Sequence, residues 1–206
     1  MYIINRHGEK VFHMKRLILI VILTFSFQSW TKADDISDFE IEGMSIGDSL
    51  LDYYTKSEII NTKPLYYNDK TFYQIAFPIN NGTYEYASFN LKENDKKYII
   101  HSIKGLNDVD GKKKECLDMK KLIVKDVLSI FKNSKEEIYT SNFNNTLGDS
   151  ISYVSDFKLD NGFIRIFCTI WDKENEEVAA YGWFDSLNVV LSTAEFLDWL
   201  NNKAYK

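Results

Sequence analysis

Hydrophobic and polar positions alternate in two stretches of the chain that share one frame. At a spacing of 80 residues, the positions Tyr73, Phe77, Ile79, Asn80, Asn81 and Gly82 correspond to Tyr153, Phe157, Leu159, Asp160, Asn161 and Gly162. Asn-Gly is typical of a type I′ hairpin turn, because both central residues of that turn need a positive φ. The pattern therefore predicts one hairpin in each half, and we interpret the correspondence as an internal repeat.

The alternation continues after each turn and predicts further strands. Second strands are predicted over 83–91 and 163–171, and third strands over 98–103 and 184–191. Hairpin connections this short join antiparallel neighbours. Each half is therefore predicted to form a three-stranded antiparallel sheet.

Helical periodicity precedes each set of strands. In the second half, apolar residues fall at i, i+3, i+7, i+11 and i+14, namely Cys116, Met119, Ile123, Val127 and Ile130. This spacing predicts an amphipathic helix that ends near Lys132. In the first half, Ser45 as an N-cap predicts a helix through Tyr54, and a short helix is predicted over 57–61.

A last helix closes the chain. Ser192-Thr193-Ala194-Glu195 has the spacing of a capping box, and Leu191 with Phe196 supplies a hydrophobic staple. We predict a helix from Thr193 to about Lys203.

These elements predict an α+β fold. Antiparallel hairpins with segregated helices belong to that class. We predict two related units over 34–107 and 108–206, each a helix followed by a three-stranded antiparallel sheet, with a C-terminal helix after the second.

The first 33 residues predict a signal peptide with an upstream extension. Met14-Lys15-Arg16 is a basic n-region, Leu17 to Phe27 is an apolar run, and Ala33 is a small residue at the expected cleavage point. The run is too short to span a bilayer core of about 30 Å, although an uncleaved anchor is the alternative. We expect a periplasmic or secreted protein with no stable membrane span after cleavage.

Cys116 and Cys168 are the only two cysteines, and both follow the predicted leader. In an oxidising compartment an isolated pair predicts one disulfide. The alternative, a cysteine nucleophile, needs a histidine partner, and only His101 remains after the leader.

The net charge of the chain limits the kinds of partner that it can bind. The chain carries a net charge of −5, and without the leader 20 basic and 29 acidic residues remain, a net of −9. Such a surface repels phosphate backbones and anionic lipid heads. Nucleic acid is therefore an unfavourable partner.

A short motif near the start of the predicted mature chain adds a resemblance. Glu42-Gly43-Met44-Ser45-Ile46-Gly47-Asp48-Ser49-Leu50 resembles the opening of the helical segment in small exported modules of the outer-membrane assembly lipoprotein type. Two such modules in tandem are also similar in plan to the bacterial β-lactamase inhibitor proteins. The chain departs from the first family in having no lipobox cysteine, and no functional residue is carried over from either.

The predicted disulfide orients the second sheet. Because Cys116 lies on the apolar stripe of its helix, a bond to Cys168 turns that side of the strand toward the helix. The other side of the strand then carries four candidate binding residues, Arg165, Phe167, Thr169 and Trp171. A guanidinium among aromatic side chains is typical of interaction hot spots. In the alternative, Phe167 and Trp171 lie beneath the closing helix and Arg165 pairs with an acidic residue.

No motif for nucleophilic catalysis, phosphate binding, a metal or a cofactor occurs in the sequence. We therefore expect an exported, non-enzymatic binding module that contacts a protein or an envelope component. Two alternatives stay open: a carrier of a small apolar ligand, which needs a cavity of at least about 300 Å³, and a hydrolase that uses paired carboxylates.

Overall fold

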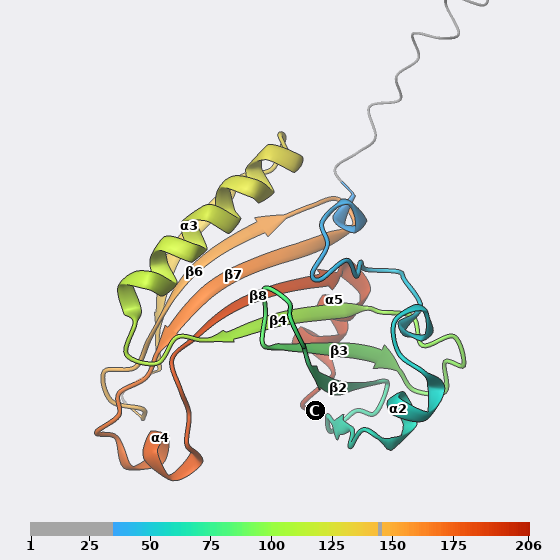
Figure 1. Cartoon of the computed structure of the whole chain (residues 1–206), viewed down its shortest axis with the longest axis horizontal. Helices are drawn as coiled ribbons and strands as arrows, with labels where there is room; N and C mark the ends of the chain where they lie inside the picture. Colours follow the sequence, from blue (N-terminus) through green and yellow to red (C-terminus); the bar gives the residue numbers. More distant parts are fainter. Residues whose placement is uncertain (1–34, 144–145) are drawn as a thin grey trace, which may run out of the picture. The chain divides into compact units, whose positions relative to one another are not determined.

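The computed structural model describes residues 35–143 and 146–206, which are built around one antiparallel sheet of eight strands (Figure 1). The strand order is β1-β2-β3-β4-β8-β7-β6-β5. The strands are β1 (Leu65–Tyr66), β2 (Phe72–Pro78), β3 (Tyr86–Lys92), β4 (Ser102–Asp108), β5 (Glu136–Asn142), β6 (Ile151–Lys158), β7 (Gly162–Ile170) and β8 (Ser186–Thr193). The predicted signal peptide, 1–33, lies outside the described residues.

The prediction of two separate three-stranded units is wrong. β4, the last strand of the first half, pairs along its whole length with β8, from Ser102 opposite Ser192 to Asp108 opposite Ser186. Two separate sheets would each leave a long edge strand with unpaired backbone groups. Pairing β4 with β8 satisfies both edges, so the two halves share one sheet. The predicted repeat stays a prediction, although its strands occupy corresponding places on either side of this central pair.

The helices match the predictions in the second half better than in the first. The helical elements are η1 (Ile36–Asp38), η2 (Leu50–Asp52), α2 (Lys56–Asn61), α3 (Lys113–Ile130), α4 (Glu176–Tyr181) and α5 (Ala194–Asn202). The amphipathic helix and the closing helix are confirmed as α3 and α5, and the short helix as α2. The N-cap of α5 is Thr193, whose side chain accepts from Phe196 N, one residue later than predicted.

The helix predicted from Ser45 to Tyr54 is absent, apart from the single 3-10 turn η2. Gly47, two residues after the predicted N-cap, adopts a positive φ of 93°, which interrupts a right-handed helix. The Asp48 carboxylate accepts a hydrogen bond from the backbone N of Ser45 at 2.8 Å, which closes a turn instead.

The two Asn-Gly pairs do not form the predicted type I′ turns. Asn81 has a φ of 64°, but neither Gly82 nor Asn161 nor Gly162 has a positive φ. Gly162 serves close packing instead, because a Cβ there would lie 2.8 Å from the carbonyl oxygen of Ser192 in β8. The Asn161 side chain accepts a hydrogen bond from Ile36 N at 3.1 Å, so this turn anchors the start of the described chain.

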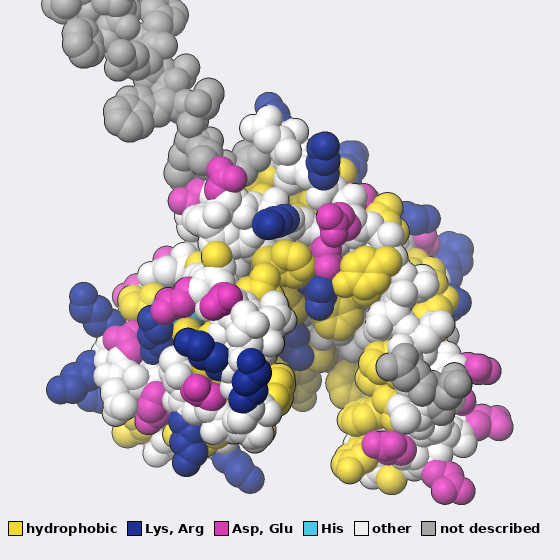
Figure 2. Space-filling model, turned by 180° about the vertical axis from the view of Figure 1, so that it is seen from behind, with side chains coloured by type: hydrophobic (Ala, Val, Ile, Leu, Met, Phe, Trp, Pro, Cys, Tyr) yellow, Lys and Arg dark blue, Asp and Glu magenta, His cyan; other side chains and the backbone are white. Residues whose placement is uncertain are grey.

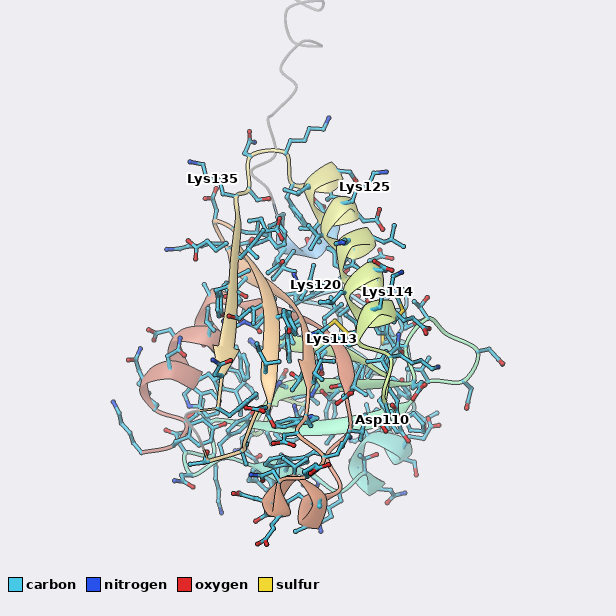
Figure 3. The ribbon with its side chains drawn as sticks, turned by 90° about the vertical axis from the view of Figure 1, so that its left-hand side faces the viewer. Asp110, Lys113, Lys114, Lys120, Lys125 and Lys135 are labelled. Carbon is cyan, nitrogen blue, oxygen red and sulfur yellow. A yellow bond between two sulfur atoms is a disulfide. The ribbon has the colours of Figure 1, made fainter. Side chains whose placement is uncertain are left out.

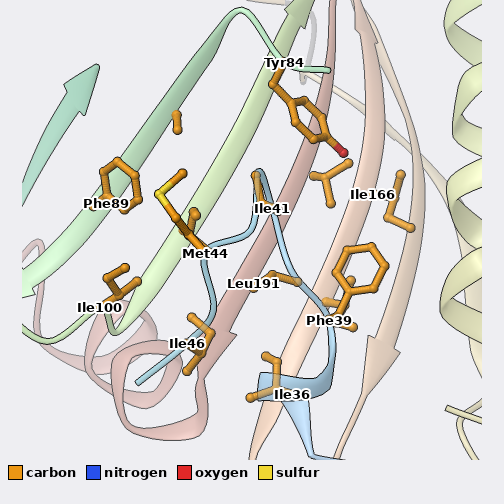
Figure 4. Packing of buried hydrophobic residues seen from close by; sticks show 14 of the residues in the cluster. Ile36, Phe39, Ile41, Met44, Ile46, Tyr84, Phe89, Ile100, Ile166 and Leu191 are labelled. Carbon is orange, nitrogen blue, oxygen red and sulfur yellow. The ribbon is translucent and has the colours of Figure 1, made fainter. Parts of the chain in front are cut away.

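One side of the sheet, which we call the covered face, carries the main core. Along β7 its residues are Ile164, Ile166 and Cys168, all fully buried. Helix α3 packs over β7 and β8, and the segment from Ile36 to Leu50 covers neighbouring strands with a row of apolar side chains (Figure 4). The opposite side, the open face, carries Arg165, Phe167 and Thr169.

The predicted disulfide is confirmed. Cys116 of α3 is bonded to Cys168 of β7, with a Cα–Cα distance of 6.0 Å, and both side chains are fully buried. Figure 3 shows α3 lying along the strands, with Lys120 directed toward the sheet. The apolar stripe is narrower than predicted, because Ile130 is 42% exposed and Lys120 is buried among the residues facing the sheet.

Removal of this disulfide tests its role in stability. In the double variant Cys116→Ala/Cys168→Ala, the free energy of unfolding should fall by about 4 kcal/mol, because the bond closes a loop of 52 residues in the unfolded chain. Urea unfolding of the variant and of the oxidised wild type measures the difference. A loss below about 1 kcal/mol would contradict the chain-entropy explanation.

Candidate functional site

A groove of about 490 Å³ runs across the open face of the sheet. Figure 2 shows this face as a hollow between two lobes, with hydrophobic side chains gathered along it. Strands from both halves form its floor, and α5 covers one end through Phe196, Leu197 and Leu200. The β4–β8 pairing is what makes the floor continuous.

All four predicted binding residues line this groove. Arg165, Phe167 and Thr169 project from β7, and Trp171 follows directly after that strand. Thr169 is buried, with its hydroxyl 2.7 Å from that of Ser152. Phe167 and Trp171 are half-buried. These residues thus lie on the side of the sheet that the disulfide predicted, and their role in binding stays a prediction.

Arg165 is held by a carboxylate and a phenol. Its Nε and Nη2 donate to the two carboxylate oxygens of Asp156, each at 2.8 Å, and Nη2 also donates to the Tyr139 hydroxyl at 3.0 Å. The Phe163 ring lies 5.2 Å from the guanidinium carbon. The hydrogen bonds to Asp156 raise the pKa of Arg165. The alternative of an acidic partner for Arg165 is correct, and its charge is neutralised within the protein.

Trp171 belongs to a row of aromatic rings at one end of the groove. Its ring lies 4.9 Å from that of Phe143 and 4.7 Å from that of Trp183, which in turn stacks on Tyr181 at 5.2 Å. The backbone N of Trp171 donates to the buried carboxylate of Asp185 at 2.8 Å. Full burial of Trp171 beneath the closing helix is therefore not observed, and part of its ring faces the groove.

Sequence reasoning missed Lys104, which also lines the groove. Among the described residues, Lys104 has no hydrogen-bond or ion-pair partner, and burial lowers its pKa. The predicted third strand ended at Ile103, whereas β4 runs on to Asp108. Had the strand been extended, alternation with Ile103 and Gly105 would have placed Lys104 on the open face.

Polar side chains make up much of the groove floor. Ser102 and Ser192 face each other across the central strand pair, with their hydroxyl oxygens 3.0 Å apart. The Tyr67 hydroxyl donates to the Asn90 amide oxygen at 2.9 Å. Hydroxyl and amide groups can both donate and accept, so the floor can pair with polar groups of a ligand.

A Ser–Lys contact lies on the covered face, away from the groove. Lys120 donates to the hydroxyl of Ser155, which donates to the Glu136 carboxylate. A lysine whose pKa is lowered by burial can activate a serine, and burial does lower the pKa of Lys120. Ser155, however, is fully buried beneath α3, so a substrate cannot reach its hydroxyl. In the described part of the chain, no group of three or more His, Cys, Asp or Glu side chains could hold a metal ion.

Comparisons with known proteins do not assign this chain to a family. No family model matches the chain, and no curated protein or solved structure matches it either. The chemistry of the groove has to be inferred from its own residues.

The ion pair between Arg165 and Asp156 should contribute to the stability of the fold. In Arg165→Met, the carboxylate of Asp156, only 6% exposed, loses its cation, so the free energy of unfolding should fall by about 2 kcal/mol. The loss is smaller than for a fully buried pair because the arginine side chain is 43% exposed. Urea unfolding of the wild type, of Arg165→Met, of Asp156→Asn and of the double variant Arg165→Met/Asp156→Asn measures the coupling. The double variant should be more stable than Arg165→Met, and purely additive losses would contradict this account.

Proposed function

We propose that the folded chain is a non-catalytic binding module that takes up a small ligand, a component of the cell envelope, in the groove on the open face. The observation that carries this proposal is the groove itself. A sheet face left uncovered in the centre, with half-buried aromatic side chains over a polar floor, is suited to hold a ligand. Phe167 and Trp171 would supply apolar contact, and the serine hydroxyls would supply hydrogen bonds.

The size of the groove favours a small ligand over a large protein surface. Small-molecule sites measure roughly 300–1,000 Å³, and 490 Å³ falls within that range. A standard protein interface buries about 800 Å² on each partner and is broader than one groove. The alternative of a carrier for a small apolar ligand is thus close to this proposal. It differs because a carrier needs an apolar cavity, whereas this groove is open and its floor is polar.

Carboxylate-based hydrolysis finds no support in this site. None of the described residues that line the groove is Asp or Glu, and the nearby Asp156 is engaged by Arg165. A general acid or base would need a carboxylate within reach of the substrate. We therefore propose binding without catalysis.

The disulfide of the chain supports the proposal that the protein is exported. The Cys116–Cys168 bond is typical of proteins in oxidising compartments such as the periplasm or the extracellular space. Within residues 35–143 and 146–206, no helix is both long and apolar enough to cross a membrane. Export itself stays a proposal that also rests on the predicted leader.

A protein partner is the second candidate function. Tyr181, a member of the aromatic row that ends the groove, is 67% exposed, and Phe184, which follows Trp183 in the sequence, is 37% exposed. Exposed aromatic side chains beside a groove are suited to protein contact. A partner bound there would extend from the groove over these rings.

A fluorescent apolar probe tests the groove. N-phenyl-1-naphthylamine should bind the wild type, and Trp171→Ala and Phe167→Ala should each weaken binding by about tenfold, because each removes a large apolar contact. Fluorescence titration measures the dissociation constants, and circular dichroism checks the fold.

Leu122→Ala is the matched control for this titration. Leu122 is 64% exposed on α3, away from the groove, so its truncation should leave probe affinity unchanged. An absence of probe binding to the wild type, or equal affinities for all the variants, would count against the proposed function.

A further inference from the structure

The two cationic side chains of the groove differ in whether another side chain of the protein neutralises their charge. Lys104 and Arg165 are the only charged side chains among the described groove-lining residues. Asp156 binds Arg165 through two hydrogen bonds, whereas Lys104 has no partner in the described part of the chain. The groove of an acidic protein thus presents one uncompensated positive charge.

The surroundings of Lys104 leave its ammonium available to a ligand. In the sheet register, Lys104 lies opposite Ser88 of β3 on one side and Val190 of β8 on the other. Neither neighbour carries a charge. Arg165 is the next residue after Val190 in the same row, two strand spacings and so about 10 Å away between Cα atoms.

Hydroxyl and aromatic groups complete the site around this charge. Two residues along β4 toward its start, Ser102 and Ser192 provide a pair of hydroxyls on the same face. In the other direction along the sheet, the row after Lys104 contains Leu106, Asn188 and Phe167. Of these three residues, Phe167 lines the groove, so a ligand that reaches Lys104 finds hydroxyl groups on one side and an aromatic ring on the other.

We propose that Lys104 binds the oxyanion head group, a carboxylate or a phosphate, of a small amphipathic ligand whose apolar part lies against Phe167 and Trp171. This inference rests on the proposed function and deepens it by naming the ligand chemistry. An ammonium half-buried without a partner gains most from an anion, because the groove screens their attraction less than bulk water does. Burial lowers the pKa of Lys104 in the empty groove, and a bound anion would oppose that shift.

Competition with a neutral probe tests the inference. N-phenyl-1-naphthylamine bound to the full-length protein is displaced with decanoate, decyl phosphate or decanol, each kept below the concentration at which it forms micelles. In the wild type, at least one of the two anions should displace the probe about tenfold more tightly than decanol. The stronger of the carboxylate and the phosphate identifies the head group.

Substitution of Lys104 locates the effect. In Lys104→Met, which keeps the length of the side chain, the anions should lose their advantage over decanol, while probe and decanol affinities stay within about twofold. Lys104→Arg should retain the advantage. Lys114→Met, whose parent side chain is 93% exposed on α3, is the control and should behave as the wild type.

Several results would overturn the inference. One is equal displacement by anions and decanol in the wild type, which needs no variant and so does not depend on whether Lys104→Met folds. Another is an anion advantage that survives in Lys104→Met. A third is tighter displacement by a short acidic peptide than by either anion, which would favour a protein partner. In the first two cases the probe still binds, so the proposed function stands, whereas the third case would favour the second candidate function. Failure of the probe to bind would reject the proposed function itself.

Discussion

The pairing of β4 with β8 is the interaction on which the rest of the structure depends. Each half of the chain ends its run of strands with a segment that would otherwise be an exposed edge. Because β4 is paired along its full length, the sheet gains a common centre and both halves contribute to one surface. Without this pairing there would be no continuous floor for the groove, whose lining residues come from strands on both sides of it.

The two faces of this sheet differ because alternate residues of a strand point to opposite sides. On the covered face, Ile164, Ile166 and Cys168 pack under α3, and the disulfide joins that helix to the sheet. On the open face, polar residues alternate with aromatic ones along β7, and α5 covers only one end. The disulfide thus fixes a helix on one face, whereas no helix of the described residues covers the centre of the other.

The sequence predicted local structure well where one physical signal dominated. The spacing of Cys116 and Val127 predicted α3, and the two cysteines correctly identified the face that carries Arg165. The β4–β8 pairing could not be predicted, because alternation shows which strands form but does not show which strands pair at long range. The prediction of a helix at Ser45 was wrong because the positive φ of Gly47 and the hydrogen bond from Ser45 N to the Asp48 side chain form a turn, and the intrinsic capping preference of Ser45 is weaker than those constraints.

The candidate site also contains some features that the sequence could predict and others that it could not. Arg165 was identifiable because it is the only arginine after the leader, yet its carboxylate partner depends on the register between β6 and β7, which the sequence does not state. Lys104 was missed because the predicted strand ended at Ile103, one residue before Lys104, whereas β4 continues to Asp108. The contrast between these two cations appears only in three dimensions, where Asp156 lies opposite Arg165 and an uncharged valine lies beside Lys104.

That contrast argues for where a ligand would bind. Burying a cation costs free energy unless an anion or hydrogen bonds compensate. At Arg165, a carboxylate and a phenol of the protein compensate the charge. At Lys104, no side chain of the described residues does so. An uncompensated, half-buried ammonium opposes folding, whereas in a groove with aromatic side chains it would contribute directly to the affinity for an anion. The place where the fold leaves a charge unsatisfied is therefore the place where binding has most to gain.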